Sequence, residues 1–143
     1  MSATAGQAQG ERGLAERLGL KPSQVVQEIG WDEDVDDELR DSIEDLTGNE
    51  LLDEESDDVV EVVLLWWRDG DGDLFDALTN AMRALADGGE IWLLTPKAGR
   101  PGHVEPSDIG EDATTAGLSQ TSSISAAPDW SGTRLVPPKG SRR

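Results

Sequence analysis

Cysteine is absent from the 143 residues of this chain, and histidine occurs only once. The absence of thiols excludes disulfide scaffolds, thiolate zinc sites, iron–sulfur clusters and cysteine nucleophiles. A single histidine cannot build a site of several histidine ligands on its own, so we expect no metal centre. Tyrosine is missing as well, and five tryptophans supply most of the aromatic content.

Long hydrophobic runs and basic residues are also scarce. No apolar run approaches the roughly 20 residues of a membrane-spanning helix, and the N-terminus lacks the apolar centre of a signal peptide. The chain has 12 basic residues against 30 acidic ones, with a formal charge of −18. This charge argues against direct binding to nucleic acid or to an anionic membrane. We therefore expect a soluble cytoplasmic protein.

The length suits one domain, since single domains usually have about 100–150 residues. Residues 1–10 and 138–143 are small and polar, with nothing to bury. They predict disordered tails, the second of them basic. Residues 11–137 should then form a single domain.

The acidic residues are concentrated in residues 28–61, which we call the acidic segment. It holds 17 acidic residues and a single basic one, Arg40. One interpretation is a solvated surface that keeps the protein soluble. The other is a surface for a protein partner, which would steer basic proteins or mimic nucleic acid.

Periodicity predicts alternating strands and helices. In chain order we expect a helix at 14–18, a strand at 25–29, a helix at 34–46, a strand at 59–67, a helix from 74 to the glycines at 88 and 89, a strand at 90–94, a helix at 107–116, and strands at 120–125 and 133–136. Such alternation implies βαβ units in a mostly parallel sheet with helices on both faces and an antiparallel pair at one edge. The apolar strands 59–67 and 90–94 should be parallel neighbours at its centre.

The stretch from Val59 to Leu94 resembles the second half of a class I methyltransferase. Two short motifs are similar to those usual in that family: Asp57–Val60, which leads into a strand, and Leu85–Gly89, which follows a helix. The likeness extends over roughly residues 22–136 and implies a Rossmann-like, methyltransferase-like α/β domain. In open α/β sheets, ligands bind at the carboxyl ends of the strands.

Three sequence motifs are more closely similar to those of a small family from high-GC Gram-positive bacteria, which is known only as a domain of unknown function. They are Leu64–Arg68, Leu94–Lys97 and Gly102–Asp108. This resemblance implies no activity, because a fold does not define a function.

The end of the first strand departs from the methyltransferase pattern. Enzymes that use S-adenosylmethionine place an acid and a glycine-rich loop there, so that backbone can approach the cofactor. Here Glu28 and Gly30 are followed by Trp31 and the carboxylates at 32–34. Bulk and negative charge oppose that approach, so we expect no S-adenosylmethionine pocket beside Gly30 and no cofactor. Residues 50–53 stand in place of the second strand.

Two sets of residues are candidates for a site. The partner-binding set belongs to the acidic segment and comprises Asp32, Glu33, Asp34, Asp37, Asp41 and Asp45. The crevice set belongs to the expected carboxyl edge of the sheet and comprises Gly30, Asp69, Asp71, Lys97, Arg100 and His103.

Each motif in the crevice set also has a plain structural interpretation. The carboxylates at 69–73 alternate as in a calcium loop, but the later ligand positions fail, so a polar turn with Asp73 capping a helix is favoured. His103 is either a proton donor beside an anion held by Lys97 and Arg100 or a solvated side chain.

Lys97 and Arg100 could also balance the negative charge of residues 32–37. Adjacent Trp66 and Trp67 must point to opposite faces of the sheet, as core residues or with one lining a crevice.

The sequence therefore favours a non-catalytic regulatory or scaffolding protein. It would bind a protein partner, expected to be basic, through the acidic segment. The alternative is an enzyme of methyltransferase type that binds S-adenosylmethionine or another small molecule in the crevice. No residue is assigned a catalytic role.

Overall fold

The structure, a computed structural model, describes residues 13–137, and both predicted tails, 1–10 and 138–143, lie outside these residues. The elements in chain order are a helix at 13–17, β1 (Val26–Ile29), α2 (Asp37–Thr47), β2 (Val60–Trp66), α3 (Leu74–Met82), β3 (Leu85–Pro96), α4 (Pro106–Thr115), β4 (Ser119–Ala127) and β5 (Trp130–Val136). This order confirms the predicted succession of strands and helices. Within the described residues, no helix is long and apolar enough to cross a membrane.

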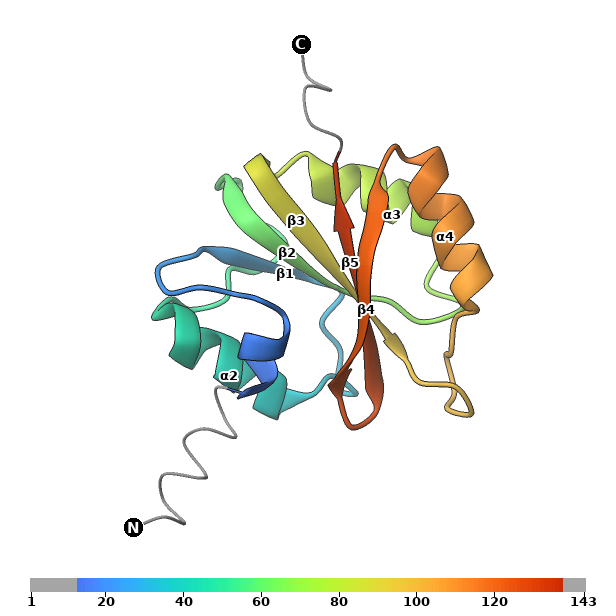
Figure 1. The fold of residues 1–143 in the computed structure, drawn as a ribbon, viewed down its shortest axis with the longest axis horizontal. Helices are drawn as coiled ribbons and strands as arrows, with labels where there is room; N and C mark the ends of the chain where they lie inside the picture. Colours follow the sequence, from blue (N-terminus) through green and yellow to red (C-terminus); the bar gives the residue numbers. More distant parts are fainter. Residues whose placement is uncertain (1–12, 138–143) are drawn as a thin grey trace.

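The strands form one five-stranded sheet in the order β1-β2-β3-β5-β4 (Figure 1). The first three are parallel, and Leu64 of β2 pairs with Trp92 of β3, which confirms the predicted central neighbours. β5 pairs antiparallel with both β3 and β4. The C-terminal hairpin therefore enters the sheet with its second strand inside and its first strand at the edge.

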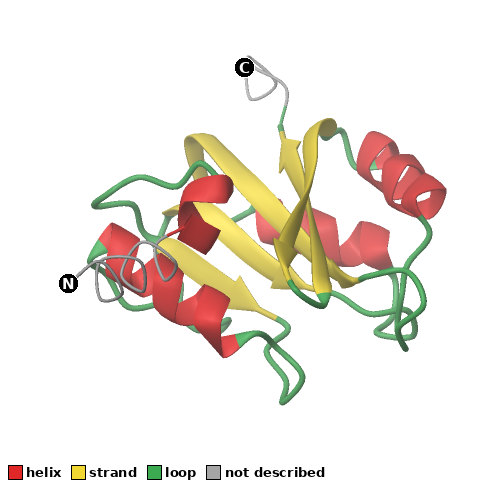
Figure 2. Ribbon diagram, turned by 60° about the horizontal axis from the view of Figure 1, so that its bottom comes forward, coloured by secondary structure: helices red, strands yellow, loops and turns green. Residues whose placement is uncertain are grey.

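Helices cover both faces of the sheet, as predicted (Figure 2). α2 and the helix at 13–17 pack on one face, and α3 and α4 pack on the other. Residues 62–66 of β2 are almost completely buried, because their alternate side chains enter the two cores. Trp66 joins the core under α2 and Trp67 packs against the core under α3, so these neighbours point to opposite faces as expected.

The prediction that the third helix continues to the glycines at 88 and 89 is wrong. α3 ends at Met82, and β3 begins at Leu85, which pairs with Val60. A Cβ on Gly89 would lie 2.9 Å from the carbonyl oxygen of Glu61, so the glycine permits close approach of two strands. The helical spacing of apolar residues continues to Leu85, because Leu85 is also half-buried as the first residue of β3. Periodicity alone therefore extends the predicted helix too far.

Two helix starts also differ from the sequence-based bounds. The predicted helix at 34–46 begins at Asp37, because Asp36 adopts an extended backbone and its carboxylate accepts from the N–H of Leu39. In α4, Ser107 lies inside the helix and does not cap it. Glu105 takes the cap position without a side-chain hydrogen bond, and Pro106 follows it as the first residue of the helix.

Residues 50–53 run beside the outer edge of β1, where the sequence places a vestige of the second methyltransferase strand. Leu52 forms an isolated parallel bridge with Gln27. The N–H of Glu28 donates to the carbonyl of Leu52 at 2.7 Å, and the N–H of Leu52 donates to the carbonyl of Val26 at 2.9 Å. This short segment covers the edge that a further strand would occupy.

Candidate functional site

The carboxyl ends of β1 and β2 meet the start of β5 at one edge of the sheet. Glu28, near the end of β1, is buried with 6% exposure. Arg40 of α2 donates two hydrogen bonds to its carboxylate, at 2.7 and 3.0 Å, and the indole N–H of Trp66 donates a third at 2.9 Å. A buried charge requires such partners. The carboxylate of Glu28 therefore holds α2 to β2.

Gly30 follows β1 and makes the closest backbone approach in this region. Its φ is +84°, and a Cβ there would lie 2.3 Å from the carbonyl oxygen of Trp66. Its N–H donates to the carboxylate of Glu54 at 3.0 Å, and its carbonyl accepts from Arg68 at 2.9 Å. Strand packing thus requires glycine here, and both backbone polar groups have partners within the protein.

Arg68, which follows β2, joins four segments of the edge in what we call the Arg68 clamp. Its guanidinium donates to the carboxylate of Asp34 at 2.5 and 2.9 Å and to Asp71 at 3.3 Å, besides the carbonyl of Gly30. It also stands 5.3 Å from the ring centroid of Trp130 at the start of β5. Hydrogen bonds from Arg68 lower the pKa of Asp34 below its ordinary value of 3.8.

Contacts of Trp130, the ring next to Arg68, connect the clamp to the core. The rings of Trp66 and Trp130 meet edge to face with centroids 4.8 Å apart. The indole N–H of Trp130 donates to the carbonyl of Asp34 at 3.3 Å. The start of β5 is therefore fastened both to β2 and to the loop that precedes α2.

A hollow of about 440 Å³, which we call the edge hollow, opens beside Gly30. Its lining includes Gly30, Trp31, Asp32, Glu54, Trp66, Trp67, Arg68, Asp71 and Asn80. The bulk of Trp31, which the sequence predicts to oppose close approach beside Gly30, does not close this space, because Trp31 turns outward with 54% exposure. Trp66, at the end of β2, and Trp67, in the loop after it, both contribute atoms to the lining, although the ring of Trp66 belongs to the core.

The structure divides the predicted crevice set into two groups. Gly30 and Asp71 line the edge hollow. Lys97 instead donates to the hydroxyl of Ser125 at 2.6 Å, and Arg100 pairs with Asp129 at 3.2 Å. Because β5 lies beside β3, the loop after β3 packs against the β4–β5 hairpin, and its two cations bind hairpin residues.

His103 and Asp69 belong to that second group. The Nδ1 atom of His103 lies 2.9 Å from the carbonyl oxygen of Pro96, and the N–H of Asp69 donates to the carbonyl of Gly102 at 2.8 Å. The cations that contact residues 32–37 are Arg40 and Arg68, so the proposed balance by Lys97 and Arg100 is replaced by these two.

The structure places the partner-binding set on two neighbouring segments. Asp32, Glu33 and Asp34 lie in the exposed loop between β1 and α2, where Asp34 is bonded to Arg68. Asp37, Asp41 and Asp45 are exposed at intervals of four residues along α2. Asp37 pairs with Arg40 at 3.3 Å.

The turn at 69–73 has the structure of a polar loop and helix cap. The carboxylate of Asp73 accepts from the N–H of Asp76 and caps α3, as predicted. Asp71 accepts from the backbone N–H of Arg68 at 3.0 Å. Across residues 13–137, no group of three or more acidic, histidine or cysteine side chains is arranged to hold a metal ion.

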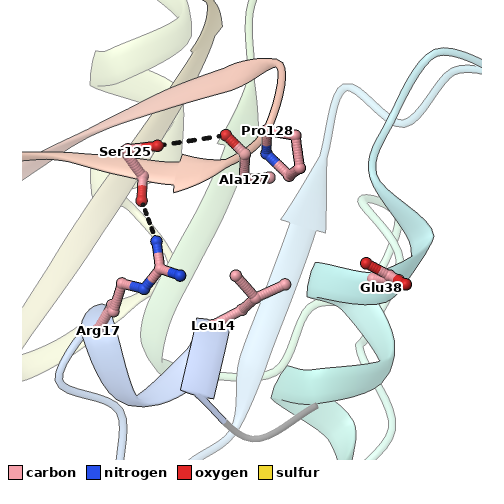
Figure 3. A pocket seen from close by; sticks show the side chains of 6 residues that line it. All are labelled: Leu14, Arg17, Glu38, Ser125, Ala127 and Pro128. Carbon is pink, nitrogen blue, oxygen red and sulfur yellow. Dashed lines mark hydrogen bonds between the residues drawn. The ribbon is translucent and has the colours of Figure 1, made fainter. Parts of the chain in front are cut away.

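A second hollow, of about 340 Å³, lies between the helix at 13–17, α2 and the β4–β5 hairpin (Figure 3). Leu14, Ala127 and Pro128 give it apolar walls, with Glu38 on α2 to one side. Arg17 donates to the backbone carbonyl of Ser125 at 3.0 Å. The charged residues in the lining of this hollow are Arg17 and Glu38, and it shares no lining residue with the Arg68 clamp.

Comparison with known proteins defines the family. The profile of the family described as "Protein of unknown function (DUF3052)" matches residues 15–139. The chain belongs to this family. Uncharacterised proteins of Mycobacterium tuberculosis and Mycobacterium bovis are 57% identical to it over 125 residues, which cover 87% of this chain and 78% of each relative.

Solved methyltransferases share the fold of this DUF3052 protein. An S-adenosylmethionine-dependent methyltransferase from Aquifex aeolicus has a TM-score of 0.60 at 14% identity, covering 87% of this chain and 88% of its own. An O-methyltransferase from neocarzinostatin biosynthesis, in complex with S-adenosylmethionine, has a TM-score of 0.61 at 11% identity, covering 81% of this chain and 49% of its own. Identity this low establishes the fold alone.

Sequence reasoning missed the residues that organise this edge. The sequence marks Arg40 only as the one cation of the acidic segment and Arg68 only as the last residue of the motif Leu64–Arg68. Glu54 and Trp130 also gave no sign of their part. An isolated cation among many carboxylates is the usable signal, because each such cation has many possible partners.

Substitution of two glycines separates strand packing from backbone conformation. Gly30→Ala and Gly48→Ala both put a methyl group at a left-handed position. At Gly48 nothing lies within 4 Å of the new Cβ, so we expect a loss of about 1–2 kcal/mol. At Gly30 the clash with Trp66 adds to this, and we expect a loss above about 4 kcal/mol or failure to fold. Urea unfolding measures both. Equal losses would show that the approach to Trp66 is unimportant.

Asp34→Asn and Asp41→Asn remove the same charge and should have opposite effects. Asp34→Asn breaks the bonds to Arg68 and should lower the free energy of unfolding at neutral pH. The pKa of Asp34 is lower in the folded chain, so its stabilisation is present above the ordinary value of 3.8 and disappears as pH falls below it. The deficit of Asp34→Asn should therefore shrink in acid.

Asp41→Asn is the matched control for Asp34→Asn. Every neighbour three or four positions from Asp41 on α2 is acidic. Its neutralisation should therefore raise the free energy of unfolding by about 0.2–0.5 kcal/mol. Urea unfolding at neutral and acidic pH tests the pair. Similar destabilisation by both variants would contradict the account of Asp34.

Proposed function

We propose that this protein is a non-catalytic binding protein whose acidic segment receives a basic protein partner. The observation that carries the proposal is the Arg68 clamp. At the carboxyl edge, where a methyltransferase binds its cofactor, this chain forms ion pairs among its own residues. These residues therefore stabilise the fold at the place where the fold usually binds a ligand.

The residues at this edge do not fit S-adenosylmethionine in the manner of that fold. The one glycine retained from the cofactor loop, Gly30, faces the carbonyl of Trp66 and has both backbone polar groups bonded to Glu54 and Arg68. The acid of the same motif, Glu28, is buried against Arg40. These groups hold each other and offer no backbone approach to a ligand.

The acidic segment has the charge and exposure that a basic partner requires. Glu28 is buried and Asp36 and Glu44 are half-buried, while its other acidic residues are exposed. On α2, Asp37, Asp41 and Asp45 follow one another at intervals of four residues, where like charges repel. A cationic partner would relieve this repulsion on binding, and its association would be steered by charge and weakened by salt.

The alternative function is an enzyme of methyltransferase type that binds a small molecule. The edge hollow favours it, because 440 Å³ lies within the range of about 300–1,000 Å³ for small-molecule sites. The bonding of Gly30, Glu28 and Arg68 opposes it. Direct titration with S-adenosylmethionine distinguishes the two functions.

Neutralisation of α2 tests the proposed partner surface. The variant Asp37→Asn/Asp41→Asn/Asp45→Asn should slow association with a partner captured from native lysate at low salt, most strongly when the salt concentration is low. It should also leave the stability of the free protein nearly unchanged, because the relief of two like-charge pairs offsets the loss of the exposed Asp37–Arg40 ion pair. Stopped-flow association rates and urea unfolding give the two readouts.

A second triple variant controls for net charge. Glu105→Gln/Asp108→Asn/Glu111→Gln makes the same charge change at exposed positions of α4 and its cap, on the other face of the sheet. It should retain the association rate of the native chain. If both triple variants slow association equally, only total charge matters. If the α2 variant loses stability and keeps its partners, the acidic segment is structural and the proposal is wrong.

A further inference from the structure

Trp31 is a large aromatic side chain that folding leaves in water. It is 54% exposed, whereas Trp66, Trp92 and Trp130 are at most 3% exposed. Its position follows from Gly30, whose left-handed backbone turns the chain out of β1. Exposed tryptophan at the rim of a concave site is typical of a contact residue, because it offers much apolar area at small entropic cost.

The lining of the edge hollow combines aromatic rings with carboxylates. Trp31 and Trp67 contribute rings, and Asp32, Glu54 and Asp71 contribute acidic groups. Rings attract cations through their negative faces, and carboxylates attract them by charge. The same groups repel phosphate and carboxylate ligands. Arg68 also lines the hollow, but its guanidinium is already paired with Asp34 and Asp71, so the remaining groups favour a cation.

The Arg68 clamp is an example, within the chain itself, of a cation bound by a tryptophan ring and carboxylates. The guanidinium of Arg68 stands over the ring of Trp130 and between the carboxylates of Asp34 and Asp71. Arg68 is bonded on all sides by the chain itself, with a side-chain exposure of 13%. It therefore leaves Asp32 and the ring of Trp31 to a cation that comes from outside.

We propose that the edge hollow receives an arginine or lysine side chain of the basic partner, held between Trp31 and the carboxylates of Asp32 and Glu54. This inference rests on the proposed function and adds an anchor to it. Asp32 and Glu54 both belong to the acidic segment, so the hollow lies within the field that steers the partner. Steering by the segment sets the association rate, and insertion into the hollow sets the dissociation rate.

The size of the hollow agrees with one long side chain and its adjoining backbone. A volume of 440 Å³ exceeds what a single guanidinium needs. It is also open to solvent at Trp31, so a side chain presented on a peptide can enter without a conformational change of the sheet. An extended basic segment would then continue along the exposed loop at 32–34 toward α2.

The test uses a short peptide in which arginines alternate with glycine and serine, together with the same peptide carrying citrulline for arginine. Citrulline keeps the shape of arginine and removes its charge. Titration calorimetry gives the affinity, and the part of the tryptophan fluorescence change that is lost in Trp31→Leu reports contact with Trp31. We expect saturable binding of the arginine peptide and at least a tenfold weaker binding of the citrulline peptide, on the order of 1.4 kcal/mol.

Three variants locate the contact. Trp31→Leu removes the ring from an exposed position and should weaken the arginine peptide about two- to fivefold, through faster dissociation. Asp32→Asn should weaken it more than Asp69→Asn, which removes the same charge from an exposed position outside the lining. Unfolding in urea confirms that each variant is folded.

The outcomes separate this inference from the function on which it rests. Unchanged affinity in Trp31→Leu and Asp32→Asn, with loss of affinity in the α2 triple variant, overturns the hollow as anchor and keeps the acidic segment as partner surface. Equal binding of the citrulline peptide overturns cation recognition. Absence of any arginine-peptide binding overturns both. Displacement of the peptide by S-adenosylmethionine overturns the anchor in favour of a small-molecule site.

Discussion

The Arg68 clamp is the interaction on which the carboxyl edge of this protein depends. One guanidinium ties the end of β1, the loop before α2, the turn before α3 and the start of β5. These segments belong to three distant regions of the chain, at 30–34, 68–71 and 130, and the clamp lies where the parallel strands meet the antiparallel hairpin. A side chain with five donors in a fixed plane suits this role, whereas lysine would satisfy only part of it.

The same edge shows how a methyltransferase-like fold can be kept without the arrangement that its chemistry requires. Glu28 and Gly30 stand where such a fold has its cofactor motif, yet Glu28 is bonded to Arg40 and Trp66, and Gly30 packs on the carbonyl of Trp66. Residues 50–53 cover β1 in place of further strands. What remains open is a hollow of aromatic and acidic character beside a strongly acidic segment, and both features favour a cationic partner.

The sequence predicts the architecture well because apolar periodicity and glycine positions are local signals. The apolar runs of β2 and β3 are sufficient for their parallel pairing at the sheet centre, and the spacing of Leu39 and Ile43 is sufficient for the buried face of α2. The site is harder, because its contacts join residues that are remote in sequence. Arg68 and Asp34 are 34 positions apart, and Trp130 and Asp34 are 96 apart. Lys97 and Arg100 lie against the β4–β5 hairpin and outside the edge hollow, because β5 is inserted beside β3, and local pattern does not predict this insertion.

The central claim is that the carboxyl edge holds its own residues and has no cofactor function. Calorimetric titration of the purified protein with S-adenosylmethionine at millimolar concentration tests it most directly. The account predicts no saturable heat, because Gly30, Glu28 and Arg68 are bonded within the chain. Saturable heat that disappears in Trp31→Leu or Asp32→Asn would contradict it and would make the edge hollow a cofactor site.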